Sequence, residues 1–406
     1  MDVEPRPTLT GSKDMPKSSL GVAVIGAGMV GRAHAAGYRV ASQLYDLDLP
    51  EIRLVAVADA HEPFATDAAA RFGYERPETS WQAIVDAPDI DVVSVAIANE
   101  LHRPVVEALL AAGKHVLCEK PLAPTVEDAT AMVAAAEAAE SQSGVGFSFR
   151  RTPAINAIRD RLEAGAIGAP RHFNGHYWCD YAQNPSNPIS WRYRGGPGTG
   201  ALADIGSHVI DLGEYLCGPI ASVSGAVFET FTTQRPVPLG ATVGHAAGAV
   251  GDKTEPVENE DIATFTARFA NGAVGTFSIS RISHGLPNGL GFELYAADGA
   301  ASFDLNRPSE FTFADHGPDA ATNGTRTVLV GPAHPGLEKG LAMDFPSVGH
   351  GQNDLFAWQA RAFLDQVAGL GKLAPLPTLA AGLHNMEVQA AITRSALDGG
   401  RAVALI

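Results

Sequence analysis

The chain has 406 residues, of which 46% are hydrophobic and 18% are charged, and its 29 basic and 45 acidic residues give a formal net charge of −16. That length suffices for two or three domains with cores of their own. The acidic balance, without any run of Lys or Arg, argues against partners such as nucleic acid or an anionic membrane surface. The cysteines at 118, 179 and 217 are far apart and lack C-x-x-C spacing, which argues against disulfides and zinc and favours the cytoplasm.

Residues 1–19 are rich in Pro, Ser, Thr and charged side chains and contain no apolar stretch, so we expect a disordered tail and not a signal peptide. In the rest of the chain no apolar run reaches the roughly 18 residues of a membrane span. We therefore expect no membrane partner.

From Leu20 onward, short β-branched apolar runs alternate with helical stretches, which is the pattern of a parallel sheet covered on both faces. We expect strands at 20–25, 53–58, 92–97, 115–118 and 144–149, and helices at 29–40, 62–72, 103–112 and 125–142. The pattern predicts a doubly wound Rossmann domain over 20–150.

A glycine-rich turn, Gly26-Ala27-Gly28-Met29-Val30-Gly31, joins the first predicted strand to the first helix. Its three glycines permit a tight turn, close approach of a pyrophosphate and helix packing, and the helix N-terminus offers free N–H groups. Asp59 ends the second strand, where a carboxylate can accept ribose hydroxyls and would repel a 2′-phosphate, although it could also simply cap the next helix. No Lys-Ser/Thr pair follows the glycines, which excludes an NTP-hydrolysing P-loop. We therefore predict a dinucleotide site, with NAD as cofactor and NADP disfavoured by the Asp59 carboxylate.

Glu119-Lys120-Pro121 follows the strand 115–118, at the carboxyl edge where open α/β sheets bind ligands. Only seven of the basic residues are lysines, so one at this position stands out. Partial burial can lower the pKa of such a lysine. Lys120 is thus a candidate catalytic residue, with a solvated loop lysine as the alternative.

After Arg151 the pattern changes to that of an α+β domain over 151–406, with a large, mostly antiparallel open sheet. The pair Asn271-Gly272 between alternating runs predicts a hairpin, and Asp298-Gly299 a second turn. We expect a helix at 153–164, a strand near 171–178, a loop at 180–200, a helix at 201–216, a long connection at 234–258, and helices at 353–369 and 379–398 that can pack back on the first domain.

Within the predicted helix 201–216, Asp204, His208 and Asp211 have the spacing i, i+4, i+7 and share one face. An Asp one turn before a His can fix its tautomer, which suits a general base for the proton of a hydroxyl. A capping Asp with a buried structural His, or a metal site, are the alternatives. No further His or Cys cluster supports a metal, so we predict none.

The motifs GVAVIGAGMVGRAH (21–34), ANELH (98–102), CEKP (118–121), GALADIGSHVIDL (200–212) and NGAVGTFSISR (271–281) together resemble the Gfo/Idh/MocA oxidoreductases over roughly 20–400. The resemblance implies that Lys120, Asp204 and His208 are catalytic and that Asn99 and His102 lie near the cofactor. The segments 149–154, 184–193 and 331–335 resemble most a member that oxidises the C3 hydroxyl of an anhydro-sugar with NAD.

Trp191 and Arg192 are expected to line the nicotinamide and sugar pocket, unless Trp191 merely packs on the sheet. Together these observations give an expected set of cofactor contacts: Gly26, Gly28, Met29, Val30, Gly31, Asp59, Asn99, His102, Glu119, Lys120, Trp191 and Arg192. Substrate contacts are expected from Lys120, Arg192, Asp204 and His208.

The predicted function is NAD-dependent oxidation of a secondary hydroxyl of a neutral sugar or cyclic polyol. An inositol 2-dehydrogenase, a keto-sugar reductase and a non-enzymatic NAD-sensing regulator remain as alternatives. By resemblance alone, the open sheet predicts a homodimer or homotetramer.

Overall fold

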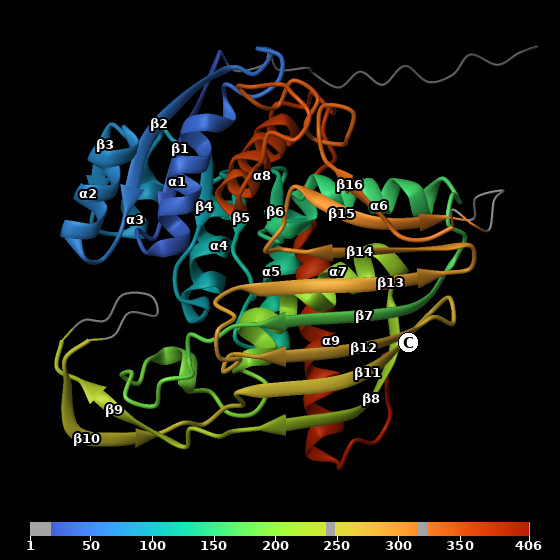
Figure 1. Cartoon of the computed structure of the whole chain (residues 1–406). Helices are drawn as coiled ribbons and strands as arrows, with labels where there is room; N and C mark the ends of the chain where they lie inside the picture. Colours follow the sequence, from blue (N-terminus) through green and yellow to red (C-terminus); the bar gives the residue numbers. More distant parts are fainter. Residues whose placement is uncertain (1–17, 241–247, 316–320, 322, 406) are drawn as a thin grey trace, which may run out of the picture.

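The computed structural model describes residues 18–240, 248–315, 321 and 323–405. The predicted tail falls outside the described residues as far as residue 17, and the first strand already begins at Ser19. Two sheets organise the chain, one in each half (Figure 1).

The first sheet has six parallel strands in the order β3-β2-β1-β4-β5-β6. Its strands are β1 (Ser19–Ile25), β2 (Glu51–Ala58), β3 (Arg76–Glu78), β4 (Val92–Val95), β5 (His115–Cys118) and β6 (Ser143–Val145). Its helices are α1 (Met29–Ala41), α2 (Glu62–Phe72), α3 (Trp81–Asp86), α4 (His102–Ala111) and α5 (Val126–Ala138), with a 3-10 turn, η1 (Asn99–Leu101), before α4. The strand order reverses between β1 and β4, which creates the crevice where doubly wound folds bind ligands and confirms the predicted fold class.

The predicted strand 144–149 is wrong beyond Val145. The Phe147 amide bonds back to the Val145 carbonyl at 3.0 Å, which closes a tight turn, and η2 (Ser148–Arg151) follows as a 3-10 helix. Likewise β4 ends at Val95, two residues earlier than expected.

The second sheet has nine strands in the order β16-β15-β14-β13-β7-β12-β11-β8-β17, and every neighbouring pair is antiparallel except β12 with β7. Its strands are β7 (Pro170–Trp178), β8 (Ile220–Glu229), β11 (Ile262–Phe269), β12 (Val274–Ser280), β13 (Gly289–Ala296), β14 (Gly299–Asp304), β15 (Glu310–Asp315), β16 (Arg326–Leu329) and β17 (Val403–Ala404). The helices α6 (Pro153–Glu163), α7 (Ser207–Cys217) and α9 (Leu379–Leu397) lie behind it in Figure 1. This confirms the predicted mostly antiparallel sheet with one open face.

The connection expected at 234–258 contains a separate two-stranded sheet, β9 (Gln234–Pro238) with β10 (Val250–Pro256). The sequence did not predict β9, because it contains Pro236 and Pro238 and proline normally marks a turn. They are tolerated here because β9 pairs on one side only.

The last two long helices pack back on the first domain, as the sequence allowed. From α8 (Gln352–Val367), Phe363 and Leu364 join a buried cluster with Val22 and Tyr38. A Cβ on Gly37 of α1 would lie 2.9 Å from the Phe356 backbone, so the helices meet at close range. The carboxyl edge of the first sheet is therefore held in a fixed relation to the second domain.

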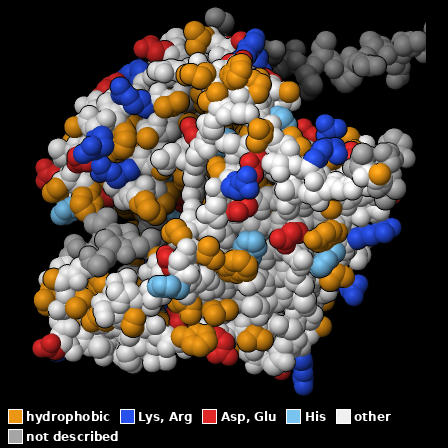
Figure 2. All heavy atoms as spheres, viewed as in Figure 1, with side chains coloured by type: hydrophobic (Ala, Val, Ile, Leu, Met, Phe, Trp, Pro, Cys, Tyr) orange, Lys and Arg blue, Asp and Glu red, His pale blue; other side chains and the backbone are white. Residues whose placement is uncertain are grey.

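Figure 2 views the uncovered face of the nine-stranded sheet directly and shows hydrophobic and histidine side chains on it. His176 stacks on Trp178 with ring centroids 3.9 Å apart, and His172 stacks on Tyr295 at 5.9 Å. Among the described residues, no helix is both long and apolar enough to cross a membrane.

Candidate active site

The glycine turn between β1 and α1 has the form that a pyrophosphate requires. Gly26 has φ +103°, and a Cβ there would lie 2.2 Å from the Ala96 carbonyl oxygen. A Cβ on Gly31 would lie 1.9 Å from the Gly26 carbonyl oxygen, whereas a Cβ on Gly28 would meet nothing within 4 Å. The N-terminus of α1 has no side-chain cap. The open space over Gly28 and the uncapped N–H groups fit a dinucleotide, with exposed Met29 and half-buried Val30 at its edge.

Asp59 lies beside this turn and supports it. Its Oδ2 accepts the Ala27 amide and its Oδ1 accepts the His61 amide, both at 2.8 Å. Each carboxylate oxygen keeps a second lone pair that a ribose hydroxyl could use. The residue therefore fits the expected ribose contact and also shapes the glycine turn.

Glu119 and Lys120 leave β5 in different directions. The Glu119 carboxylate is buried and lies 2.9 Å from His34 Nε2, so it ties β5 to α1 instead of facing the site. The Lys120 Nζ donates to the main-chain carbonyl of Asp204 at 2.5 Å and lies 3.8 Å from its Oδ1. Lys120 is thus directed at the second domain, as a catalytic lysine would be.

The start of the helix that carries Asp204 and His208 is a π-turn, η4 (Leu202–Gly206), and not the α-helix that the sequence predicted. The Ser207 amide bonds to the Leu202 carbonyl, five residues back, before α7 begins. A π-turn has i→i+5 hydrogen bonds in place of i→i+4 bonds and often occurs at functional sites.

Within the residues that the structure describes, the expected orienting hydrogen bond from His208 Nδ1 to Asp204 is not formed, although the Asp204 charge still acts on the pKa of the ring. Asp204 Oδ2 instead accepts the hydroxyl of Tyr181 at 2.7 Å and lies 4.0 Å from Arg192 Nε. Among the described residues, His208 Nδ1 is buried without a hydrogen-bond partner.

His208 occupies an apolar environment, with its ring edge-on to Phe149 at 4.8 Å and its side chain only 8% exposed. Burial and, less strongly, the Lys120 charge hold the pKa of His208 well below its usual value, against an opposing effect of Asp204. The ring is therefore neutral near pH 7, which is the state that can accept a proton. Because Nδ1 is closed off, Nε2 is the nitrogen left to do so.

Asp211, the third member of the expected face, has a different role. Its carboxylate accepts Arg150 Nη2 at 2.6 Å and Nε at 2.9 Å, and it is 3% exposed. Burial raises the pKa of Asp211 to about 6. The pair links η2 to α7 below the site.

A cavity of about 500 Å³ brings four of the expected residues together at the carboxyl edge of the first sheet: Asn99, Trp191, Arg192 and Asp204. Trp191 is 46% exposed, and the Arg192 guanidinium lies 4.4 Å from its ring centroid. Part of the cavity lining comes from α9 and includes Gln389, a contribution that the sequence did not indicate.

His102 is not among the residues that line this cavity. Its ring is 1% exposed, with Nδ1 3.2 Å from the Leu122 carbonyl and Nε2 3.1 Å from that of Ile97. The geometry favours a positioning role in which His102 ties together the loops after β4 and β5.

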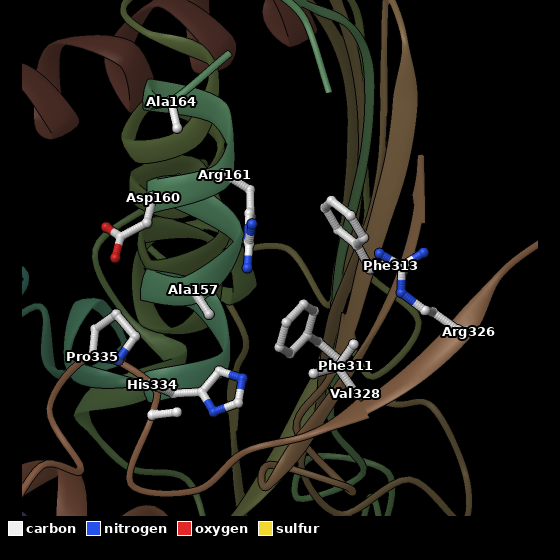
Figure 3. Close-up of a pocket in the computed structure, with 11 residues that line it drawn as sticks. Ala157, Asp160, Arg161, Ala164, Phe311, Phe313, Arg326, Val328, His334 and Pro335 are labelled. Carbon is white, nitrogen blue, oxygen red and sulfur yellow. The ribbon is translucent and has the colours of Figure 1, made fainter. Parts of the chain in front are cut away.

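A second cavity, about 650 Å³, lies between α6 and the strands β15 and β16, lined by Phe311, Phe313 and Arg326 among others (Figure 3). None of the expected site residues lines it, so a cavity of this size does not by itself mark the active site. No group of three or more His, Cys, Asp and Glu side chains that could hold a metal occurs in the described part of the chain.

Sequence reasoning missed three residues that shape the site: Tyr181, Asn259 and Glu260. Tyr181 binds Asp204, while Asn259 and Glu260 hold the loop and turn that lead to it. The only signal for Asn259 and Glu260 was the run of four polar residues, 258–261, directly before an alternating strand.

Comparison with known families gives the class of protein that this geometry indicates. Residues 20–147 match the oxidoreductase family with an NAD-binding Rossmann fold (GFO_IDH_MocA), and residues 155–302 match the GFO/IDH/MocA C-terminal domain. The chain belongs to this family. The predictions of an oxidoreductase and of NAD as its cofactor are confirmed.

Several individual proteins of named activity are similar to this chain. The chain is 37% identical to levoglucosan dehydrogenase of Pseudarthrobacter phenanthrenivorans over 93% of this chain and 96% of that protein. A solved levoglucosan dehydrogenase in complex with NADH and levoglucosan superposes with a TM-score of 0.86 and 35% identity, covering 95% of this chain and 99% of that one. Inositol 2-dehydrogenase of Acidothermus cellulolyticus is 34% identical over 49% of this chain and 53% of its own length.

Proposed function

We propose that the protein is an NAD-dependent dehydrogenase that oxidises a secondary hydroxyl of a neutral sugar or cyclic polyol, with levoglucosan as the first candidate substrate. The observation that carries this proposal is the contact of Lys120 with Asp204, beside the neutral His208, whose pKa is affected by the charges of both. Asp204 lines the cavity at the nucleotide-binding edge, whereas Lys120 and His208 are not among the residues that line it. The near full-length similarity to levoglucosan dehydrogenase supports the substrate class.

In this proposal His208 is the general base. It takes the proton of the hydroxyl while the C–H bond of the same carbon breaks and a carbonyl forms. Bound NAD supplies the acceptor for the hydride. A neutral imidazole suits this step because a protonated ring could not accept the proton.

Lys120 and Asp204 control charge at the reacting oxygen. The Lys120 ammonium stabilises the developing alkoxide, and its bond to the Asp204 carbonyl fixes its reach. Asp204 and Arg192 offer acceptor and donor groups to neighbouring hydroxyls of the substrate. An acidic sugar fits less well, because the chain carries a net charge of −16.

The cofactor contacts are proposed as follows. The turn 26–31 receives the pyrophosphate through backbone N–H groups, Asp59 accepts the ribose hydroxyls, and Asn99 and Trp191 border the nicotinamide end. Glu119 and His102 act on the cofactor only through the loops that they hold, given their burial and partners.

The test is a panel of levoglucosan, inositols, glucosides and keto-sugars with NAD and NADP, followed by absorbance of the reduced cofactor at 340 nm. We expect turnover of levoglucosan or a related neutral sugar with NAD, and weak activity with NADP. A protein that binds NADH but turns over none of these compounds would overturn the proposal and favour the NAD-sensing regulator.

We also propose assembly into a homodimer or homotetramer through the open sheet and a cytoplasmic location. The stacked aromatic pairs on the uncovered face support the first. The three free, buried cysteines support the second. Light scattering of the purified protein, and its repetition with Trp178→Glu, tests the interface: a monomeric variant is expected.

A further inference from the structure

A buried polar segment, residues 259–261, lies beneath the loop that lines the cavity and has no part in the chemistry proposed above. Asn259 and Glu260 are each 1% exposed and Asp261 is 0% exposed. Burying such groups is unfavourable unless their hydrogen bonds are made, so their partners indicate what the segment holds.

Glu260 holds the backbone just before the π-turn. Its Oε2 accepts the Gly198 amide at 2.8 Å, and its Oε1 accepts the Leu202 amide at 2.9 Å. Its main-chain carbonyl accepts the Ala201 amide at 3.1 Å. A Cβ on Gly200 would lie only 2.3 Å from that carbonyl oxygen, so the two backbones are in direct contact.

Asn259 and Arg281 hold the preceding loop in the same way. The Asn259 amide donates to the Arg192 carbonyl at 3.0 Å and to the Arg194 carbonyl at 3.1 Å. Arg281 donates to the Arg192 carbonyl at 3.1 Å and to Asn259 Oδ1 at 2.9 Å, while Asp261 anchors it at 2.9 Å. The loop and the π-turn are therefore fixed by one buried network.

We propose that Glu260 is a positioning residue that fixes where the π-turn lies, so that the Asp204 carbonyl is within hydrogen-bonding distance of the Lys120 ammonium. The Glu260 carboxylate accepts the Leu202 amide, two residues before Asp204, at the first residue of the π-turn. Burial raises the pKa of Glu260, and the Leu202 and Gly198 amides oppose that rise, as expected for a carboxylate kept for its backbone donors. The expected effect of Glu260 on the reaction rate rests on the proposed function, whereas its expected effect on the contact between Asp204 and Lys120 does not.

The test is Glu260→Gln, because the amide keeps the size of the side chain but turns an N–H₂ group toward one of the two backbone N–H donors. The first readout is the rate of reductive methylation of Lys120 by formaldehyde and borohydride in the absence of substrate, measured by mass spectrometry. Loss of the Asp204 contact is expected to raise that rate about tenfold. Lys114, which is buried against the Ala87 and Ile90 carbonyls far from the site, is the internal control and should not change.

The second readout is kinetic. With the substrate found in the panel, kcat is expected to fall about 10- to 100-fold while the Kd for NADH, measured by fluorescence, stays within about twofold. Because methylation needs no turnover, a chain inactive on every sugar would overturn the proposed function and still leave the role of Glu260 testable.

Asp365→Asn is the matched control, since Asp365 is also 1% exposed and accepts two backbone amides, those of Lys372 and Leu373, away from the site. It should leave the methylation of Lys120 unchanged. If Glu260→Gln fails to fold, Glu260→Asp keeps the charge and shortens the reach. A lower melting temperature with unchanged Lys120 methylation, or failure of both variants to fold, would assign Glu260 to stability alone and overturn the proposal.

Discussion

The ammonium of Lys120 donates to the main-chain carbonyl of Asp204 at 2.5 Å, whereas the nearest oxygen of the Asp204 carboxylate lies 3.8 Å away. The backbone thus fixes the lysine, and the carboxylate remains shared among Lys120, Tyr181 and Arg192. In the proposed function, a substrate hydroxyl would meet a donor and an acceptor already in place in this group.

Lys120→Met should raise the pKa of His208, because the ammonium is the second-largest cause, after burial, of its lowered value. In the wild type the ring is expected to stay neutral at pH 6.5 and to titrate only well below it. The unfolded chain takes up this proton near pH 6.5, so the wild type loses stability from this group as pH falls below 6.5. NMR of 15N-labelled histidine, assigned with His208→Gln, measures the shift. A wild-type ring that titrates at 6.5 contradicts this account.

Substitutions of two glycines in the nucleotide turn should distinguish an effect on cofactor binding from an effect on stability. Gly28→Ala is expected to keep the wild-type melting temperature and to weaken NADH binding about tenfold or more, since its Cβ enters only the space for the pyrophosphate. Gly31→Ala should lower stability by about 1–3 kcal/mol, because its Cβ would lie 1.9 Å from the Gly26 carbonyl oxygen. Calorimetry and NADH fluorescence measure both, and a loss of stability in Gly28→Ala would be the unexpected result.

Removing the Asp211 carboxylate should destabilise the fold. Asp211→Ala leaves the Arg150 guanidinium, whose side chain is 23% exposed, without its bidentate partner, and a loss of about 3 kcal/mol is expected in urea unfolding. Asp398→Ala provides the control, because its ion pair with Arg401 is largely exposed and should contribute nothing measurable. Equal midpoints for the two variants would argue against a buried pair.

The three thiols should react slowly with Ellman's reagent in the folded protein. Cys118, Cys179 and Cys217 are at most 4% exposed, and burial raises the pKa of Cys179 and of Cys217 to about 12. The reactive thiolate is therefore scarce near pH 7. Three equivalents should react at once in urea, and rapid labelling of native Cys179 would show that the region of the site is more open than described.

The sequence predicted the structural features that depend on a local pattern of residues. It did not predict contacts between residues that are far apart in the chain. The glycine turn, the doubly wound class of the first domain and the Asn271-Gly272 hairpin follow from spacing alone, and the structure has them. The sequence did not indicate the π-turn at 202–206 or the hydrogen bond that Tyr181 donates to Asp204, whereas the expected hydrogen bond from His208 Nδ1 to Asp204 is not formed among the described residues. Nothing near Glu260 in the sequence indicates that its carboxylate meets amides some sixty residues earlier in the chain.

The packing of α8 on α1 has a consequence for biosynthesis. Residues 20–150 leave the ribosome first, yet the buried cluster around Tyr38 includes Phe363 and Leu364. Until that helix is synthesised, an apolar face of the nucleotide-binding domain has no cover and is open to association with other nascent chains. Completion of the first domain is therefore one of the last events in making this enzyme, and a chain broken before α8 should aggregate, not bind cofactor.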